Sequence, residues 1–410
     1  MPPIPALSNR ERAVVNVTNW TYFNPVRIVS AAGSSARLAE HIGYRRIALV
    51  TSPGFTRRGV VERVRASLGT RLVAVLDDVK PNPDVLDVDA QADVLRPLAP
   101  DCIVALGGGS SIDTAKGLAR LLSQPPGATL AAHFREGASF SSALAALPVV
   151  AIPTTAGTGA EVTPFGTIWD FGLGKKYSVT GTDLYPTAAV LDPELTLDLP
   201  EEVTISSGLD AISHALESTW NRNASPITLG MTTKSLQLSL PALERLRVDL
   251  RDVGARDAMM QASLLAGLAI SQTRTALAHS ISYPLTTKFN LPHGIACSFT
   301  LPTLMKFNAE ADDGRLHDLA RAIGHADTEA FSDDLSARFA ELGVAGLFRR
   351  YVPSSDAAME LASQMITPGR ADNNLRSVSV EGVADLLAAS LEQVGGGYQV
   401  PAAHVVVARH

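Results

Sequence analysis

The chain has 410 residues, 46% of them hydrophobic, and carries 35 Lys and Arg residues against 41 Asp and Glu residues. The resulting net charge of −6 excludes a strongly basic surface, so we expect neither a nucleic acid nor an anionic membrane as the main partner. The length exceeds that of one ordinary hydrophobic core and predicts two domains, residues 1–195 and residues 196–410.

Cysteine usage and the N-terminal sequence bear on where the protein works. Cys102 and Cys297 both lie in apolar runs typical of buried, reduced thiols, which favours the cytoplasm. The first residues show no apolar segment behind a basic start, so we expect no secretory signal. No apolar run approaches the roughly 20 residues of a membrane span. We therefore expect a cytoplasmic protein that assembles as a homo-oligomer, in the simplest case a dimer.

Short apolar runs alternate with helical segments from about Val26 to Leu191, a pattern typical of a parallel sheet covered by helices. Segment 167–191 is expected to leave the sheet as a hairpin-like excursion and to return to it. The predicted strands are 47–51, 71–76, 102–106, 147–152 and 188–191, and the predicted helices are 34–42, 60–68, 85–95 and 112–122.

A glycine-rich junction, Gly107–Gly109, follows the third predicted strand and is called the glycine loop below. Bare glycines let a ligand approach the backbone closely, and the N-terminus of a helix favours an anion. Ser110 and Asp113 have the spacing of a capping box, and Lys116 follows near the first turn, where a bound anion would offset its unfavourable interaction with the helix dipole. A tight turn without a ligand explains the glycines nearly as well.

A hydroxyl-rich segment, residues 154–159, follows the fourth predicted strand and is called the threonine loop below. Thr154, Thr155 and Thr158 lie just past the carboxyl end of that strand, which suits a ligand lying over the sheet. Ordinary turn chemistry is an equally good explanation of this segment alone. Two such loops, each directly after a strand, together indicate a nucleotide-type ligand.

From Pro200 onward, strand signals nearly vanish and apolar residues adopt helical spacing. The polar loop 368–374 is a candidate border of a cleft, and the tail after Gly395 matches no clear element. The predicted helices are 208–220, 227–240, 255–273, 276–283, 315–323, 334–342, 357–365 and 380–391, with a helix or strand at 297–305.

Asp210 and His214 are four residues apart in a predicted helix, so their side chains point from one face. His279 and His293 flank a downstream segment, and His279 follows apolar residues, where an unpaired imidazole would be unfavourable. One carboxylate and three imidazoles suit Fe(II) or Zn(II) and leave room for a substrate oxygen. A single buried histidine is more often a hydrogen-bonded core residue than a metal ligand, so the prediction depends on the whole set.

Four motifs occur in the order GGGSSIDTAK (107–116), PTTAGTGAEVT (153–163), GLDAISHALE (208–217) and HSISYPLTTKFNLPHG (279–294). With them the chain resembles the iron-containing (group III) alcohol dehydrogenases over about residues 24–305. The resemblance implies a dinucleotide-binding α/β domain, an all-helical C-terminal domain as in dehydroquinate synthase, and a metal in the cleft between them. It implies the metal ligands Asp210, His214, His279 and His293, and the cofactor contacts Gly108, Gly109, Ser110, Asp113, Thr154, Thr155, Thr158 and Lys176.

Two positions depart from the usual pattern of that family. Many members carry a histidine four residues after the third ligand that can relay a proton, and Tyr283 stands there in this chain. A phenol is a poorer base than an imidazole at neutral pH. Members that prefer NAD usually have an acidic residue after the first of the predicted strands, where this chain has Ser52 followed closely by Arg57 and Arg58. We therefore expect NADP(H), with NAD(H) tolerated.

Arg274 and Lys288 flank His279 and Tyr283 in the sequence, and such cations suit an anionic substrate better than a plain aliphatic alcohol. Both can equally be solvated surface residues. The segment 271–294, which contains these residues, and residues 169–178 resemble the phosphonoacetaldehyde reductase branch of the family. This resemblance implies reduction of phosphonoacetaldehyde to 2-hydroxyethylphosphonate. Reduction of another small anionic or aliphatic aldehyde, and a lyase reaction of the dehydroquinate synthase type, stay open as alternatives. A non-catalytic scaffold would need neither the glycine loop nor the ligand set.

Overall fold

The computed structural model describes residues 19–395 and divides into two compact units. The α/β unit contains residues 23–211 and 238–271, and the helical unit contains residues 19–22, 212–237 and 272–395. Each unit therefore draws on separate stretches of the chain, whereas the sequence predicts consecutive domains that meet at residue 195. The expected absence of a signal sequence and the unassigned tail concern residues 1–18 and 396–410, which lie outside the described residues.

The α/β unit consists of a parallel sheet, an antiparallel hairpin and covering helices, as predicted. The sheet strands are β1 (Arg27–Ser30), β2 (Ile47–Thr51), β3 (Leu72–Leu76), β4 (Cys102–Gly107), β5 (Val149–Pro153) and β8 (Ala188–Leu191), and the hairpin strands are β6 (Phe165–Asp170) and β7 (Lys175–Thr180). The helices are α1 (Leu38–His41), α2 (Pro53–Arg57), α3 (Val60–Leu68), α4 (Val85–Leu95), α5 (Gly109–Ser123), α6 (Leu130–Glu136) and parts of α7 (Glu201–Thr219), α8 (Pro226–Val248) and α9 (Val253–Thr273).

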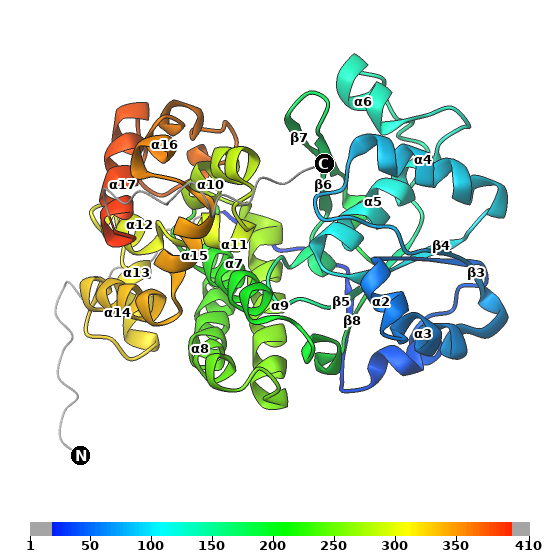
Figure 1. Ribbon diagram of the computed structural model, residues 1–410, viewed down its shortest axis with the longest axis horizontal. Coiled ribbons are helices and arrows are strands. Elements are labelled where there is room, and N and C mark those ends of the chain that lie inside the picture. Colours follow the sequence, from blue (N-terminus) through cyan, green and yellow to red (C-terminus); the bar gives the residue numbers. More distant parts are fainter. Residues whose placement is uncertain (1–18, 396–410) are drawn as a thin grey trace. The chain divides into compact units, whose positions relative to one another are not determined.

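Successive residues of a strand point to opposite sides of the sheet, and in this sheet the residues on both sides are buried. Ile47 and Leu49 of β2 belong to the core that contains α3, while Ala48 and Val50 belong to the core that contains α4 and α5. Figure 1 shows α2 and α3 on one side of the strands and α4 and α5 on the other. Burial on two faces explains why these strands read as unbroken apolar runs rather than as alternating patterns.

The winding of the sheet reverses between β2 and β4. The strand order is β1-β8-β5-β4-β2-β3, so the chain moves from β2 outward to β3 and then returns past β2 to β4 and β5. Loops that leave β2 and β4 therefore lead to opposite faces, and parallel sheets bind nucleotides in the crevice that opens there. Ser52 directly follows β2, and the glycine loop spans the end of β4 and the start of α5.

The sequence prediction misses β1, α2 and α6. Strand β1 is a short edge strand with largely exposed residues, so no apolar run marks it. Helix α6 is also short, and its local signal is Thr129, whose hydroxyl accepts the backbone N–H of Ala132 at 3.0 Å. The predicted excursion is confirmed, because β6 and β7 pair in antiparallel register within and beside residues 167–191.

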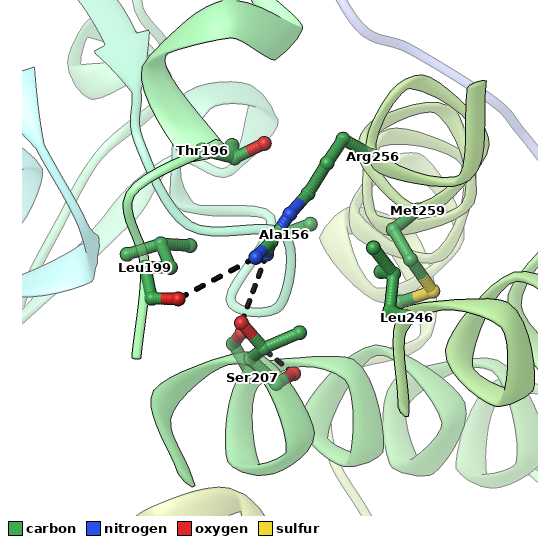
Figure 2. Close-up of a pocket in the computed structure, with 8 residues that line it drawn as sticks. Ala156, Thr196, Leu199, Ser207, Leu246, Arg256 and Met259 are labelled. Carbon is green, nitrogen blue, oxygen red and sulfur yellow. Dashed lines mark hydrogen bonds between the residues drawn. The ribbon is translucent and has the colours of Figure 1, made fainter. Parts of the chain in front are cut away.

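Arg256 of α9 links this helix to the segment that leads into α7. Its side chain is buried and donates hydrogen bonds to Thr204 Oγ1 at 2.9 Å and to the Leu250 carbonyl at 2.8 Å. Figure 2 shows the guanidinium group pointing toward the backbone of Leu199, whose carbonyl it meets at 3.5 Å. Burial lowers the pKa of Arg256, but arginine remains charged in proteins, so these carbonyl and hydroxyl oxygens are needed as partners.

The helical unit confirms the predicted change to helices, and beyond β8 the described chain contains no further strand. Among residues 19–395, none of the helices combines the length and hydropathy that a bilayer span requires. The helical unit contains parts of α7, α8 and α9. Its other helices are α10 (Leu277–Phe289), α11 (His293–Ser298), α12 (Leu301–Ala309), α13 (Arg315–Ala322), α14 (Thr328–Glu341), α15 (Val344–Tyr351), α16 (Ser355–Met359) and α17 (Val380–Gln393).

The prediction for the helical unit differs from the structure in several details. Helix α14 begins at Thr328 rather than at Asp334. The predicted helix 357–365 is broken, because α16 ends at Met359 and a separate 3₁₀ turn covers Ala362–Gln364. Helix α15 was not predicted, since only Leu342 and Gly343 separate it from α14. Gly343 has a φ of 70°, a left-handed conformation that glycine adopts without strain and that allows so short a connection.

A close backbone contact within the α/β unit gives the first testable prediction. A Cβ added at Gly267 of α9 would lie 2.7 Å from the Cα of Gly159, whereas among the described residues no atom would lie within 4 Å of a Cβ at Gly230 of α8. We expect Gly267→Ala to lower the free energy of unfolding by about 1 to 3 kcal/mol through this clash. Gly230→Ala should raise it by up to about 1 kcal/mol, since alanine is the better helix former. Equal effects in urea unfolding would contradict the close contact.

Candidate metal centre and nucleotide loops

Helix α7 presents Asp210 and His214 from one face, as the spacing predicts. Both side chains are buried. The division between the two units falls between Ala211 and Ile212, inside this continuous helix. The helix itself therefore holds the carboxylate and the imidazole one turn apart.

Three of the predicted metal ligands meet within the helical unit. The ring of His214 stacks on that of His279, with centroids 4.8 Å apart and an interplanar angle of 14°. The ring of His293 meets that of His279 edge-on, with centroids 5.2 Å apart. His279 lies in α10, and His293 is the first residue of α11, directly after Pro292. Segments far apart in the sequence thus bring the three imidazoles together.

Donor atoms around these histidines lie close enough together that they could hold a metal ion. One potential ligand atom each from Asp210, His279, His293 and Cys297 lies within 4.8 Å of the other three. Three of these residues belong to the predicted set, and Cys297 was predicted only as a buried thiol. The fourth predicted ligand, His214, stacks on His279 but is not one of these four residues, so its role as a ligand stays a prediction. A carboxylate, imidazoles and a nearby thiol are the donor types that Fe(II) and Zn(II) take in proteins.

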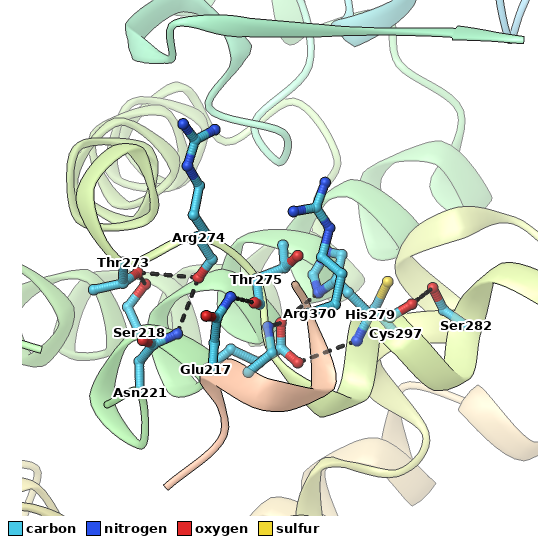
Figure 3. Close-up of polar contacts among 12 residues, drawn as sticks. Glu217, Ser218, Asn221, Thr273, Arg274, Thr275, His279, Ser282, Cys297 and Arg370 are labelled. Carbon is cyan, nitrogen blue, oxygen red and sulfur yellow. Dashed lines mark hydrogen bonds and ion pairs between the residues drawn. The ribbon is translucent and has the colours of Figure 1, made fainter. Parts of the chain in front are cut away.

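Glu217 fixes the orientation of His279 (Figure 3). Its carboxylate lies 2.6 Å from Nδ1 of His279 and accepts the backbone N–H groups of His279 and Ala276, each at 3.1 Å. Burial opposes ionisation of Glu217, but the attraction to His279 and these hydrogen bonds outweigh it and hold the pKa of the carboxyl below its usual value. With Nδ1 bound to the carboxylate, Nε2 becomes the nitrogen that offers a lone pair, as in carboxylate–histidine–metal groups.

The sequence reading missed Glu217, although it lies in the motif GLDAISHALE. It follows His214 by three residues, and residues at this spacing are neighbours on a helix surface. A second acidic residue one turn beyond a candidate ligand was therefore an available signal. Its partner His279 lies 62 residues downstream, and no local pattern reveals that contact.

The glycine loop and the threonine loop pack against each other within the α/β unit. A Cβ at Gly108 would meet Thr155 Oγ1 at 3.1 Å, and a Cβ at Gly109 would meet Thr158 Cγ2 at 2.9 Å. The adjacent ends of β4 and β5 align the two loops. The glycines are therefore required by the approach of the threonine loop as well as suited to a ligand, and the two loops form one rim at the carboxyl edge of the sheet.

The predicted capping box of Ser110 and Asp113 is wrong. Helix α5 begins at Gly109 with Gly108 as its N-cap, so Ser110 already lies inside the first turn. The hydroxyl of Ser110 instead accepts the backbone N–H of Asn82 at 3.1 Å. Because the N-cap is a glycine without a side chain, the first N–H groups of α5 remain suited to an anion such as a pyrophosphate.

Lys116 is committed to the protein and does not present its charge to a ligand, which corrects the role expected from the sequence. It is 0% exposed, and burial lowers its pKa to about 8. Its ammonium donates to the carbonyls of Ala160, Thr163 and Phe165 at 2.7 to 2.8 Å and to Thr163 Oγ1 at 3.1 Å. The neighbouring Glu161 is also buried, and burial raises its pKa to about 7. Lys116 thus fastens the end of the threonine loop to α5.

The remaining predicted cofactor contacts occupy different environments in the α/β unit. Thr154 is buried, and its backbone N–H donates to the Gly107 carbonyl at 3.1 Å, while Thr155 and Thr158 are half-buried. The ammonium of Lys176 lies over the ring of Trp169 at 5.4 Å from its centroid. Cofactor binding by these residues stays a prediction, with Thr155 and Thr158 the better placed of the three threonines.

The residues predicted near the substrate are not equivalent. Tyr283 lies one turn after His279 on α10, and its hydroxyl accepts a hydrogen bond from Nε of Arg370 at 3.2 Å. Lys288 follows His279 by nine residues, which corresponds to half a turn around the helix, and it is exposed. Lys288 therefore faces away from His279, and we no longer assign it to the substrate site.

Arg274 has an unusual backbone conformation just before α10. Its φ of 66° is rare for a residue with a side chain, and its carbonyl accepts hydrogen bonds from Asn221 Nδ2 and Thr273 Oγ1, each at 3.1 Å. Strain of this kind is usually retained at functional sites. Figure 3 shows the guanidinium groups of Arg274 and Arg370 extending to the same side. Arg370 belongs to the polar loop 368–374 and was not singled out from the sequence.

Comparison with known families covers most of the chain. The family model described as iron-containing alcohol dehydrogenase matches residues 25–193. The model described as the C-terminal part of the Fe-containing alcohol dehydrogenase family matches residues 204–391. The two matches meet near residue 195, where the sequence predicts the domain boundary.

Three related proteins illustrate the match. Phosphonoacetaldehyde reductase of Streptomyces viridochromogenes is 37% identical over 286 residues, which are 68% of this chain and 71% of that protein. The 4-hydroxybutyrate dehydrogenase of Cupriavidus necator is 37% identical over 293 residues, 69% of this chain and 76% of that protein. The crystal structure of sulfoacetaldehyde reductase from Bifidobacterium kashiwanohense in complex with NAD+ has a TM-score of 0.83 and 30% identity, covering 90% of this chain and 98% of that one.

The contact between Glu217 and His279 gives a prediction about metal affinity. Glu217→Gln replaces a carboxylate, which only accepts hydrogen bonds, by an amide whose NH₂ group donates them. This NH₂ group would face N–H groups that the carboxylate accepts in the unmodified protein. We expect affinity for Fe(II) or Zn(II), measured by competition with a chelator, to fall about 10- to 100-fold. Glu201→Gln at the exposed first turn of the same helix is the control and should bind as the unmodified protein does. Equal affinities for both variants would contradict the assigned role.

Proposed function

The chain belongs to the family of iron-containing alcohol dehydrogenases, and on this premise we propose that it is an NAD(P)H-dependent reductase of a small anionic aldehyde, first of all phosphonoacetaldehyde. As a member of this family it is an oxidoreductase that acts on CH–OH groups and uses iron and NAD(P). The anionic substrate and the preference for NADP(H) are the finer parts of the proposal. A cytoplasmic location and a homodimeric state stay predictions from the sequence.

The observation that carries the anionic substrate is that two arginines, one of them bonded to Tyr283, extend their guanidinium groups to the same side. Arg370 bonds to the Tyr283 hydroxyl, and Tyr283 lies one helix turn from His279. Arg274 extends its guanidinium group to the same side as Arg370 (Figure 3). Guanidinium groups bind phosphonate, sulfonate or carboxylate through paired N–H donors, and a plain aliphatic aldehyde offers them no partner.

The named relatives support the same substrate class. Phosphonoacetaldehyde, 4-hydroxybutyrate and sulfoacetaldehyde each combine an aldehyde or alcohol group with an acidic group that is ionised at neutral pH. The acids differ in shape and charge, so the shared feature is a small anion beside the reacting carbon chain. We favour the phosphonate because the stretch 274–294 resembles that branch of the family.

In the proposed reaction the bound metal supplies a Lewis acid for the carbonyl oxygen, and the nicotinamide supplies the hydride. Asp210, His214, His279 and His293 would hold the metal ion. The Tyr283 hydroxyl accepts a hydrogen bond from Arg370, so its own proton can be donated to the nascent alcohol oxygen. Arg274 and Arg370 would orient the aldehyde by its anionic end.

The arginines give a prediction about substrate choice. We expect Arg370→Met and Arg274→Met each to lower kcat/KM for phosphonoacetaldehyde about 10- to 100-fold, as the loss of a hydrogen bond between charged groups implies. The value for propionaldehyde should change far less in Arg274→Met. In Arg370→Met it should fall less than the value for phosphonoacetaldehyde, but not stay unchanged, because the hydrogen bond to Tyr283 is lost as well. The assay is NADPH oxidation, and Lys288→Met, on the far side of α10, is the matched control.

Either of two outcomes would contradict the anionic substrate. The first is that the unmodified enzyme reduces propionaldehyde as efficiently as phosphonoacetaldehyde. The second is that the arginine variants lose both activities to the same extent. Sulfoacetaldehyde belongs in the same assay, because a preference for it would keep the arginine assignment and change only the named substrate.

Ser52 gives a prediction about the cofactor. It is half-buried at the end of β2, next to the reversal in strand order, where an acidic residue would accept the ribose hydroxyl and repel a 2′-phosphate. We expect Ser52→Asp to raise the ratio of kcat/KM for NADH to that for NADPH by about tenfold or more. Ser52→Ala removes the hydroxyl without adding charge and should leave the ratio nearly unchanged. An unchanged ratio in Ser52→Asp would place the specificity elsewhere.

A further inference from the structure

Cys297 lies beside the metal centre, although the sequence set of ligands does not include it. It follows His293 by four residues in α11, so the helix turns both side chains to one face. Its Sγ lies 3.6 Å from Nε2 and 3.7 Å from Nδ1 of His293, and the residue is fully buried. Figure 3 shows Cys297 close to His279 as well.

The two distances locate the sulfur relative to the imidazole of His293. An atom in the plane of the ring cannot be this far from both nitrogens without overlapping a ring carbon, so nearly equal distances place Sγ over the face of the ring. The thiol therefore leaves the in-plane lone pair of His293 accessible to a metal ion. Sulfur and imidazole nitrogen can then approach one ion from different directions.

The spacing of the donors is within reach of a single ion. The ligand atoms of Asp210, His279, His293 and Cys297 lie within 4.8 Å of one another. Two ligands of a tetrahedral zinc ion, with bonds of about 2.3 and 2.1 Å, lie about 3.6 Å apart, which matches the 3.6 Å between Sγ and Nε2 of His293. Joint coordination then requires the Cys297 side chain to turn from the face of the ring toward the ion. This proximity distinguishes Cys297 from Cys102, which is buried in β4 of the α/β unit.

We propose that Cys297 is a further ligand of this metal centre and binds as a thiolate, an inference that depends on the metal site of the proposed function. A coordinating thiol gives up its proton, so Cys297 and Asp210 together would neutralise a divalent ion. A soft sulfur donor shifts the preference of the site from iron toward zinc or cobalt.

Cobalt(II) tests this directly, because a thiolate bound to cobalt gives a charge-transfer band in the near ultraviolet that nitrogen and oxygen ligands do not give. The protein is freed of metal with a chelator and loaded with Co(II) alone, and bound cobalt is measured. We expect the band in the unmodified protein and in Cys102→Ser, and its loss in Cys297→Ser and Cys297→Ala. A protein that binds cobalt without the band, or a Cys297 variant that keeps it, would overturn the proposal.

The test holds even if both Cys297 variants fail to fold. The chain has only two cysteines, so a band in Cys102→Ser must come from Cys297. Aldehyde reduction is measured separately on the same preparations. Turnover without the band would overturn the thiolate ligand and leave the reductase assignment intact. The band without turnover on any aldehyde would support the thiolate ligand and overturn the reductase assignment.

Discussion

A buried carboxylate paired with one imidazole is the contact on which the metal centre depends. Glu217 is 0% exposed, and an isolated charge there would be strongly unfavourable. The ring of His279 and two backbone N–H groups at the start of α10 satisfy it. The same contacts fix the position of that ring relative to α7, which also carries Asp210 and His214. One buried hydrogen bond between a carboxylate and an imidazole thus sets the spacing of the candidate ligands from two helices.

The α/β unit uses a second buried charge for a comparable purpose. Lys116 draws together the carbonyls that follow the threonine loop, while the glycines of the neighbouring loop let the two loops touch. The rim that results is held from behind by Lys116, so its outer hydroxyl and N–H groups are available for a ligand. In both units a buried ionisable side chain positions groups that we predict to bind a ligand.

Local periodicity explains which features the sequence could predict. Buried strands such as β2 and β4 read as apolar runs, and Asp210 and His214 follow from the helical repeat. The start of α5 was misplaced by three residues because glycines carry no helix signal, and Lys116 was misread because its partners lie more than 40 residues away. The contacts of Glu217 and Arg370 join residues 62 and 87 apart, which no local pattern reveals.

The central claim is that Asp210, His214, His279 and His293 bind one divalent metal. Diffraction from iron-loaded crystals, recorded at the iron absorption edge, tests it most directly. We expect a single anomalous peak about 2.0 to 2.3 Å from a carboxylate oxygen of Asp210 and from one nitrogen of each histidine. Iron bound elsewhere, or an anomalous map without a peak at these four side chains, would contradict it.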